Sequence, residues 1–415
     1  MRYDLNELRD RLARYESCRD IPTPTEPSRL IGPESVGARG VAARRGRFWH
    51  RSTAYQLQDP WGETIVERLL DRALPTDQHG ALRVPFHDPQ SRVPLSSCVF
   101  VDCETTGLSG GVGTIAFLIA LGRYDGEAFV VDQYFLPDLA DEGAILDCVA
   151  EQLDHAAAVV TYNGRAFDLP LLEGRFRFWR LEPAFRELPD LDLLWPTRAL
   201  FSHRLPSCAL SQVEEQLLKF ARVEDLPGAE VPQVYFQYLH EGFSPRLHAV
   251  FEHNWCDVVS LFVYSLWLDQ ETLPERPTLA APDDLAALAR LWFRHRQPAA
   301  ALAALDEDER RVLDQGQRAH LHELRGRILK RERAYDAAHT QWEKVARIGP
   351  LRHDAAVEMA KHLEHRRHDY AAAMAVVDQA LDILRFREAS GENVDGARTE
   401  LLKRRLRLRR RLRCV

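Results

Sequence analysis

Residues 97–268 constrain the fold most, because strand and helix patterns alternate there in a fixed order. Three strand-like runs come first, and the last two flank Asp125-Gly126, a dipeptide typical of hairpin turns. The expected elements are strands at 99–103, 114–124 and 128–135, a helix at 143–155, a strand at 157–162 and a helix at 169–180. This order predicts an α/β fold, a mixed sheet flanked by helices on both faces.

Composition divides the rest of the chain. Residues 1–45 become rich in Pro, Gly and Arg, and we expect a partly disordered or irregular lead-in there. Residues 46–96 are expected to form an extension that packs on the α/β domain, which we place at residues 97–272. A proline-bearing linker follows, and residues 283–400 are rich in Ala, Leu and Arg and helical in pattern.

The helical region contains weak internal repeats. Three related Ala-rich segments have anchor positions 299, 335 and 370, which lie 36 and 35 residues apart. This spacing is close to the period of about 34 residues in tetratricopeptide arrays, so we predict an all-α tetratricopeptide-like repeat domain, with a plain helical bundle as the alternative. Residues 401–415 are expected to be a basic C-terminal tail, whose arginines contact phosphates or whose leucines cap the repeats.

Charge and cysteine usage limit the function. The net charge is −7, but residues 401–415 carry eight Lys and Arg, so residues 1–400 hold 47 basic against 62 acidic groups. Such an acidic body argues against a general nucleic-acid coat protein and suits an enzyme that holds cations in an acidic site. Seven cysteines without a C-x-x-C pair favour reduced thiols. Because we find neither a signal core nor an apolar run of membrane length, we expect a cytoplasmic protein with no membrane partner.

The first acidic centre ends the first strand of the α/β region. Asp102 and Glu104 are two residues apart, so their side chains point to the same face of that strand. Adjoining carboxylates on an apolar strand need a cation between them, and oxygen ligands suit Mg²⁺ or Mn²⁺. The alternative is a strand end that reaches solvent.

Two further centres follow. Asp168 comes after an Asn163-Gly164 turn, where it could instead be a helix N-cap. His253 and Asp257 are four residues apart and share one helix face, where an ordinary surface pair is the alternative. Together, four carboxylates and a histidine suit two-metal phosphodiester hydrolysis, in which two divalent ions roughly 3.5–4 Å apart activate water and stabilise the leaving oxygen. The histidine would accept the proton of the water.

These motifs resemble those of a known group. Asp-x-Glu-Thr-Thr-Gly-Leu from Asp102, Asn-Gly-x-x-Phe-Asp from Asn163 and His-Asn-x-x-Asp from His253 are similar to the three motifs of the four-acid (DEDD) 3′–5′ exonucleases, which have the ribonuclease H-like fold. The resemblance covers residues 97–268. With helical repeats behind it, the architecture resembles the bacterial YprB-like exonucleases, also called mitomycin repair factor B.

The resemblance implies roles for individual residues. It implies that the first of two Mg²⁺ or Mn²⁺ ions is bound by Asp102, Glu104 and Asp257. Asp102 would share the second ion, with Asp168 contributing directly or through water. Contacts with the terminal nucleotide and its strand would come from Thr105, Thr106, Gly107, Leu108, Asn163 and Phe167.

The last motif departs from the family pattern. The family places either tyrosine four residues or histidine five residues before the final aspartate. Here His253 stands four residues before Asp257, and Glu252 stands at five. The resemblance makes His253 the general base, with non-standard spacing.

We therefore expect a metal-dependent 3′–5′ exonuclease that acts on single-stranded DNA ends in DNA repair, with a helicase as a sensible partner for the repeats. DNA is preferred over RNA only because the relatives by architecture point to DNA repair. The alternatives are an exoribonuclease that trims RNA 3′ ends and a non-catalytic repeat scaffold.

Overall fold

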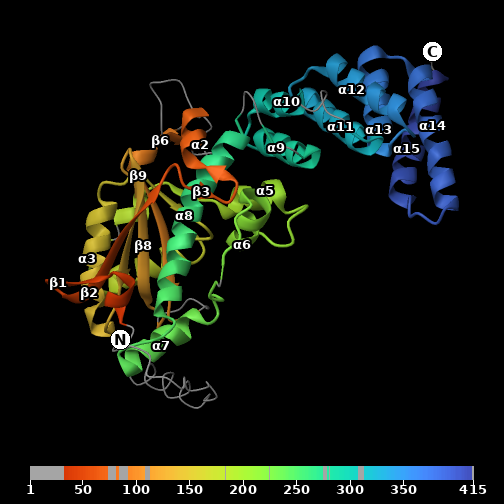
Figure 1. Ribbon diagram of the computed structural model, residues 1–415. Coiled ribbons are helices and arrows are strands. Elements are labelled where there is room, and N and C mark those ends of the chain that lie inside the picture. The colour runs from red at the N-terminus through yellow and green to blue at the C-terminus, as the bar shows by residue number, and fades with distance from the viewer. Residues whose placement is uncertain are drawn as a thin grey trace. The chain divides into compact units, whose positions relative to one another are not determined.

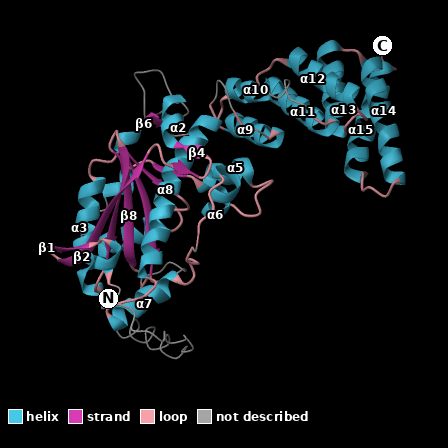
Figure 2. Ribbon diagram, in the orientation of Figure 1, coloured by secondary structure: helices cyan, strands magenta, loops and turns pink. Residues whose placement is uncertain are grey.

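The computed structural model describes residues 32–72, 81–83, 92–107, 113–182, 184–223, 225–273, 278–279, 281–306 and 313–413. The chain divides into two compact units, Met1–Gln270 and Glu271–Val415 (Figures 1 and 2). Expectations for residues 1–31, for Leu108 and for most of the linker fall outside the described residues. Within those ranges, every helix is too short or too polar to cross a membrane.

A seven-stranded mixed sheet forms the centre of the first unit, in the order β1-β2-β9-β8-β7-β10-β11. β7, β10 and β11 run parallel to one another, and every other neighbouring pair is antiparallel. The strands are β1 (Arg39–Ala43), β2 (Gly46–Gln56), β7 (Cys98–Thr105), β8 (Ala116–Tyr124), β9 (Ala128–Phe135), β10 (Ala158–Thr161) and β11 (Asp190–Asp192).

The predicted order of strands and helices is confirmed. The three strands β7, β8 and β9 are followed by α3 (Glu142–Leu153), β10 and α4 (Asp168–Phe178). The β8–β9 hairpin turns at Gly126, whose φ of 106° favours glycine. Asp125 Oδ1 stabilises the same turn by accepting the backbone N–H groups of Glu127 and Ala128 at 2.9 and 2.8 Å.

Two strands extend the sheet ahead of this pattern. β2 pairs with β9 from Trp49 opposite Phe135 to Gln56 opposite Ala128, and β1 pairs with β2 at the edge. The structure differs here from the expected irregular lead-in, which included residues 39–43. These two strands lack a regular buried and exposed alternation, so backbone pairing rather than side-chain pattern defines them.

Short elements complete the first unit. Two small hairpins are β3 (Pro60–Trp61) with β4 (Thr64–Ile65), and β5 (Ala81–Arg83) with β6 (Arg92–Pro94). The helices are α2 (Val66–Arg72), α5 (Leu194–Phe201), α6 (Leu210–Val213), the π-helix η5 (Glu214–Leu218), α7 (Val231–Glu241) and α8 (Leu247–Glu271), with single 3₁₀ turns η1 (Pro33–Val36), η2 (Leu95–Ser97), η3 (Leu139–Asp141) and η4 (Ala184–Glu187).

The two faces of β7 have different neighbours. Val101 belongs to a buried cluster that includes residues of α3 and α4. Phe100 points to the opposite face and packs edge-on against Phe262 of α8, with ring centroids 5.6 Å apart. Gly122 on β8 allows α8 to approach, since a Cβ there would lie 2.6 Å from Val258 Cγ1. The face of β7 that carries Phe100 therefore looks toward α8.

The described part of the second unit is helical. Its helices are α9 (Pro282–Arg294), α10 (Pro298–Asp306), α11 (Gln315–Arg331), α12 (Tyr335–Ile348), α13 (His353–His362), the π-helix η7 (Leu363–Arg367), α14 (Tyr370–Ala389) and α15 (Asp395–Leu412). Left-handed residues precede α10, α12 and α14 by two positions each: Arg296, Arg333 and His368. The same kind of turn thus joins the two helices within each of three successive hairpins. Each predicted repeat segment lies at the start of the second helix of its hairpin.

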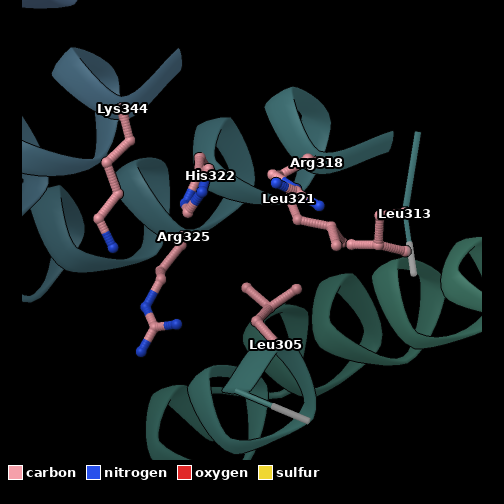
Figure 3. A pocket seen from close by; sticks show the side chains of 7 residues that line it. All are labelled: Leu305, Leu313, Arg318, Leu321, His322, Arg325 and Lys344. Atoms are coloured by element: carbon pink, nitrogen blue, oxygen red, sulfur yellow. The ribbon is translucent and has the colours of Figure 1, made fainter. Parts of the chain in front are cut away.

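A cavity of about 320 Å³ lies among α10, α11 and α12 (Figure 3). Leucines and basic side chains line it together: Leu305, Leu313, Arg318, Leu321, His322, Arg325 and Lys344. Further along the unit, most of the expected basic tail instead belongs to α15. Leu401 and Leu408 are buried, so this helix packs on the helical unit through its leucines.

Candidate active site

Asp102 and Glu104 lie on the face of β7 that also carries Phe100. They therefore face α8, and the part of α8 opposite them lies about two helical turns before Phe262. A bulge between Glu104 and Thr105 interrupts the pairing with β8 next to these acids. Strand alternation and the packing of α8 together bring the first and third sequence motifs to one place.

Asn254 connects the two elements directly. Its side chain is fully buried, and Nδ2 donates to Asp102 Oδ2 at 2.7 Å. Its Oδ1 accepts from Gln133 Nε2 of β9 at 2.9 Å, and Gln133 also donates to the Phe251 carbonyl. The sequence motif contains Asn254, but its role as the link between β7, β9 and α8 emerges only from the fold.

Glu104, His253 and Asp257 form the tightest group. One ligand atom from each lies within 4.8 Å of the other two. His253 Nε2 is 3.5 Å from Asp257 Oδ2 and 3.9 Å from Glu104 Oε1. Because His253 and Asp257 are four residues apart on α8, as predicted, both side chains point toward the Glu104 carboxylate of β7.

Asp168 is the first residue of α4, and its side chain is buried. Phe167 occupies the N-cap position, so Asp168 is not the capping residue that the sequence left open. Burial raises the pKa of Asp168 to about 7, and the charges of Asp192 and Asp257 add to this effect. Asp168 thus belongs to the same electrostatic cluster as the acids of β7 and α8.

Burial and mutual repulsion strain the carboxylate cluster. Burial, with the charges of Asp257, Glu104 and Asp168, raises the pKa of Asp102 well above its usual range. Burial also raises the pKa of Glu104 to about 8, although the positive charge of His253 opposes the shift. A cation would relieve this repulsion, and an oxygen-rich donor set suits Mg²⁺ or Mn²⁺. The residues present therefore fit a divalent metal centre.

His253 is oriented by an acid that the sequence analysis did not single out. Asp225 Oδ1 lies 2.7 Å from His253 Nδ1, and because a carboxylate oxygen accepts, this contact favours the tautomer in which Nδ1–H donates the hydrogen bond. Nε2 is then the nitrogen that faces Glu104 and Asp257. Burial lowers the pKa of His253, but Asp257, Glu104 and Asp225 outweigh burial and raise it overall.

The structure also decides between the two positions before Asp257. Glu252, five residues before it, pairs with Arg51 of β2 at 2.7 Å. His253, four residues before it, faces the carboxylates. The non-standard spacing therefore still places an imidazole at the acidic cluster.

Arg222 is a second residue that the sequence analysis missed. Its guanidinium pairs with Asp257 and with the buried Glu214, and Nη1 lies 3.5 Å from Asp225. Arg222 and Asp225 come from the segment between η5 and α7, which has no periodic pattern. They lie about 30 residues from His253 and Asp257 in the chain, so no spacing signal could have identified them.

The Asn163-Gly164 turn is held by a further acid. Asn163 has a left-handed φ of 65°, and its backbone N–H donates to Asp192 Oδ1 at 2.8 Å. A Cβ at Gly164 would lie 2.4 Å from Thr161 Cβ, which explains the glycine. The side chain of Asn163 is exposed and that of Phe167 is partly buried, so the turn leaves Asn163 open to solvent.

The residues after Glu104 form a compact turn. Thr105 is buried, and its hydroxyl donates to the Gly107 carbonyl at 3.0 Å. Thr106 Oγ1 accepts the backbone N–H of Ile115 at 3.0 Å. Both hydroxyls thus hold the turn in place, and Leu108 lies outside the described residues.

Comparisons with known proteins identify a matching family and similar proteins. A sequence profile described as the RNase_H superfamily matches residues 99–268. The uncharacterized protein YprB of Bacillus subtilis (strain 168) is 30% identical over 285 residues, which cover 68% of this chain and 68% of that protein. Among solved structures, the family B DNA polymerase of the hyperthermophilic archaeon Pyrobaculum calidifontis aligns with 15% identity and a TM-score of 0.35. The alignment covers 59% of this chain and only 30% of the polymerase.

Proposed function

The chain belongs to the RNase_H superfamily, within which it is a relative of Bacillus subtilis YprB, and from this premise we propose that it is a metal-dependent 3′–5′ exonuclease of DNA. Membership of the superfamily supports a nuclease that hydrolyses nucleic acid. The finer proposal concerns the direction of cleavage, the choice between DNA and RNA as substrate, and the metal ions.

One observation carries the proposal. Carboxylates from three separate segments, with one histidine, meet at a single place on the sheet: Asp102 and Glu104 of β7, Asp168 of α4, and His253 and Asp257 of α8. All three sequence motifs contribute to this cluster, which supports the roles that the resemblance to DEDD exonucleases implies. A structural ion pair would not need four mutually repelling acids.

We propose that Asp102, Glu104 and Asp257 hold one divalent cation and that Asp102 and Asp168 share a second. Two such ions, when bound, would lower the pKa of an attacking water and stabilise the leaving oxygen. All four carboxylates come from regular elements, β7, α4 and α8, which supports defined positions for the two ions. Asn254 keeps Asp102 oriented through its 2.7 Å hydrogen bond.

His253 would act as the general base. Asp225 holds its Nδ1 proton, so Nε2 is available to take a proton from water at the carboxylate cluster. The imidazolium that results is stabilised by three neighbouring acids, Asp225, Asp257 and Glu104. The histidine therefore suits transient protonation.

We propose single-stranded DNA 3′ ends as the substrate and DNA repair as the setting, from the resemblance to the mitomycin repair exonucleases. The exposed Asn163 and partly buried Phe167 beside Asp168 are proposed to line the path of the strand, next to the turn at Thr105, Thr106 and Gly107. The alternative substrate is the 3′ end of RNA.

The second unit is proposed to be a tetratricopeptide-like domain that binds a protein partner such as a helicase. Its three successive helical hairpins with matching left-handed turns support this proposal. Deletion of residues 283–415 should abolish a pull-down with the helicase and leave nuclease activity intact. Loss of catalysis without loss of binding would contradict the assignment.

The test of direction and sugar uses labelled oligonucleotides. The full chain is incubated with 3′- or 5′-labelled single-stranded DNA and RNA, in Mn²⁺, Mg²⁺ or EDTA. The proposal predicts metal-dependent release of labelled mononucleotide from the 3′ label, a descending ladder from the 5′ label, and faster cleavage of DNA. Faster cleavage of RNA would favour the exoribonuclease, and no cleavage of any substrate by the folded protein would favour the scaffold.

A further inference from the structure

Arg222 lies between the carboxylate cluster and a second, deeper acid. Its Nε and Nη2 donate to the two carboxylate oxygens of Glu214 at 2.8 and 2.6 Å, and Nη2 also donates to Asp257 Oδ1. Only 9% of the Arg222 side chain and 1% of the Glu214 side chain are exposed. The planar guanidinium is therefore fixed by a bidentate pair and presents its charge to Asp257.

Glu214 is itself held by the core of the first unit. Ser260 of α8 donates its hydroxyl to Glu214 Oε1, and the indole Nε1 of Trp61 donates to Ser260 Oγ at 2.9 Å. A buried hydrogen-bonded series thus runs from Trp61 through Ser260 and Glu214 to Arg222. Glu214 cannot move away without leaving buried polar groups unpaired.

The β3–β4 hairpin packs against residues 218–220, which lead into Arg222. Phe220 stacks on Trp61 with ring centroids 4.1 Å apart, and the Glu63 N–H donates to the Leu218 carbonyl at 3.0 Å. Gly62 has a φ of 62°, and a Cβ there would lie 2.3 Å from the Leu218 carbonyl oxygen. The N-terminal extension, to which the sequence assigned no function, therefore fixes the position of Arg222.

The Arg222–Glu214 pair is neutral as a whole but not symmetric. Its positive end touches Asp257, and its negative end faces Ser260 and the core. A cation fixed against Asp257 offsets part of the repulsion among the carboxylates, and the same charge repels a divalent ion bound by Asp257. A hydrogen-bonded carboxylate oxygen keeps further lone pairs, so Asp257 can bind Arg222 and a metal ion together.

We propose that Arg222 is a built-in counter-cation, held by Glu214, that stabilises the metal-free acidic cluster and limits its affinity for divalent metal. This inference rests on the proposed function, in that it assumes Asp257 is a metal ligand. Arg222 acts through Asp257 and is a positioning residue, not a catalytic one.

The proposal predicts opposite effects from the two halves of the pair. Arg222→Gln removes the repelling charge and should tighten Mn²⁺ binding by about tenfold or more. Glu214→Gln leaves Arg222 without its neutralising partner and should weaken Mn²⁺ binding by a similar factor. The Arg222→Gln/Glu214→Gln double variant should bind Mn²⁺ more tightly than the wild type but less tightly than Arg222→Gln, because Arg222 is the member of the pair that contacts Asp257. Arg222→Lys, which keeps the charge, should stay close to the wild type.

Calorimetric titration of the full chain with Mn²⁺ alone tests this, with thermal unfolding in EDTA as a second readout. Metal-free Arg222→Gln should unfold at lower temperature than the wild type and recover more on addition of Mn²⁺. Weaker binding by both single variants would show general damage to the site and overturn the proposal, as would unchanged binding by both.

The failure of the metal centre itself is distinguishable. Wild-type protein must bind Mn²⁺, and Asp257→Asn must lose most of that binding. If the wild type binds no Mn²⁺, the proposed function fails before Arg222 is tested. If Arg222→Gln does not fold, the sign of the Glu214→Gln effect and the behaviour of the double variant decide the proposal.

Discussion

Asn254→Ala tests whether the site depends on the link between β7 and α8. The substitution removes the 2.7 Å hydrogen bond that Nδ2 of the fully buried Asn254 donates to Asp102 Oδ2. Gln133 keeps its bond to the Phe251 carbonyl at 2.8 Å, so its amide nitrogen is not left unpaired and the variant should fold. The change should therefore act mainly on the orientation and charge of Asp102.

The expected magnitude follows from the role of the bond. Loss of a hydrogen-bond partner behind a metal ligand typically lowers metal affinity by about 10–100-fold, or about 1.4–2.7 kcal/mol. The direction agrees with the pKa of Asp102, which this bond lowers against burial and three neighbouring acids. Without Asn254, Asp102 holds its proton more strongly and binds a cation less well.

Calorimetric Mn²⁺ titration at pH 7.5 measures the effect. Ser265→Ala is the matched control, since Ser265 is also buried on α8 and, among the described residues, its hydroxyl bonds only to the Phe262 carbonyl of its own helix. It should bind Mn²⁺ as the wild type does. If Asn254→Ala stays within twofold of the wild type while folded, Asp102 does not depend on Asn254 and the reasoning is refuted.

Two further predictions concern packing and pH. Gly122→Ala should lower the free energy of unfolding by about 1–3 kcal/mol, because the added Cβ would lie 2.3 Å from Phe129 Cζ and 2.6 Å from Val258 Cγ1. Chemical denaturation measures this, and an unchanged midpoint would contradict the close approach of α8. Burial lowers the pKa of the stacked His339 and His362 below the value of about 6.5 in the unfolded chain. Below that pH the unfolded chain binds more protons at these two residues than the folded chain does. The free energy of unfolding should therefore fall as the pH drops below about 6.5. Thermal unfolding at pH 7.5 and 5.5 should show a smaller loss for His362→Gln, and an equal loss would count against this pair.

The order of the central elements could be predicted from sequence because each has a strong local pattern. The apolar runs of β7 and β8 and the Asp125-Gly126 turn are local signals, and the fold agrees with them. The strands β1 and β2 were missed because their side chains do not alternate cleanly and because β9, which pairs with β2 and joins them to the sheet, lies far along the chain. Long-range backbone pairing leaves little trace in a single sequence.

The candidate site shows the same division. Strand alternation placed Asp102 and Glu104 on one face, and helix spacing placed His253 with Asp257, before the fold showed that the faces meet. Neither strand alternation nor helix spacing identifies the residues outside these motifs that contact the site. Arg222 and Asp225 lie in an irregular segment, and only tertiary packing brings them to α8.

We propose above all that the acidic cluster of β7, α4 and α8 hydrolyses nucleic acid from a 3′ end. The most direct measurement is Mn²⁺-dependent mononucleotide release from 3′-labelled single-stranded DNA by the wild type and by Asp102→Asn. Asp125→Asn, in the exposed β8–β9 turn, is the matched control. We expect release by the wild type and by Asp125→Asn, and loss of at least about 100-fold in rate for Asp102→Asn. Equal release by Asp102→Asn, or none by the folded wild type, would contradict the account.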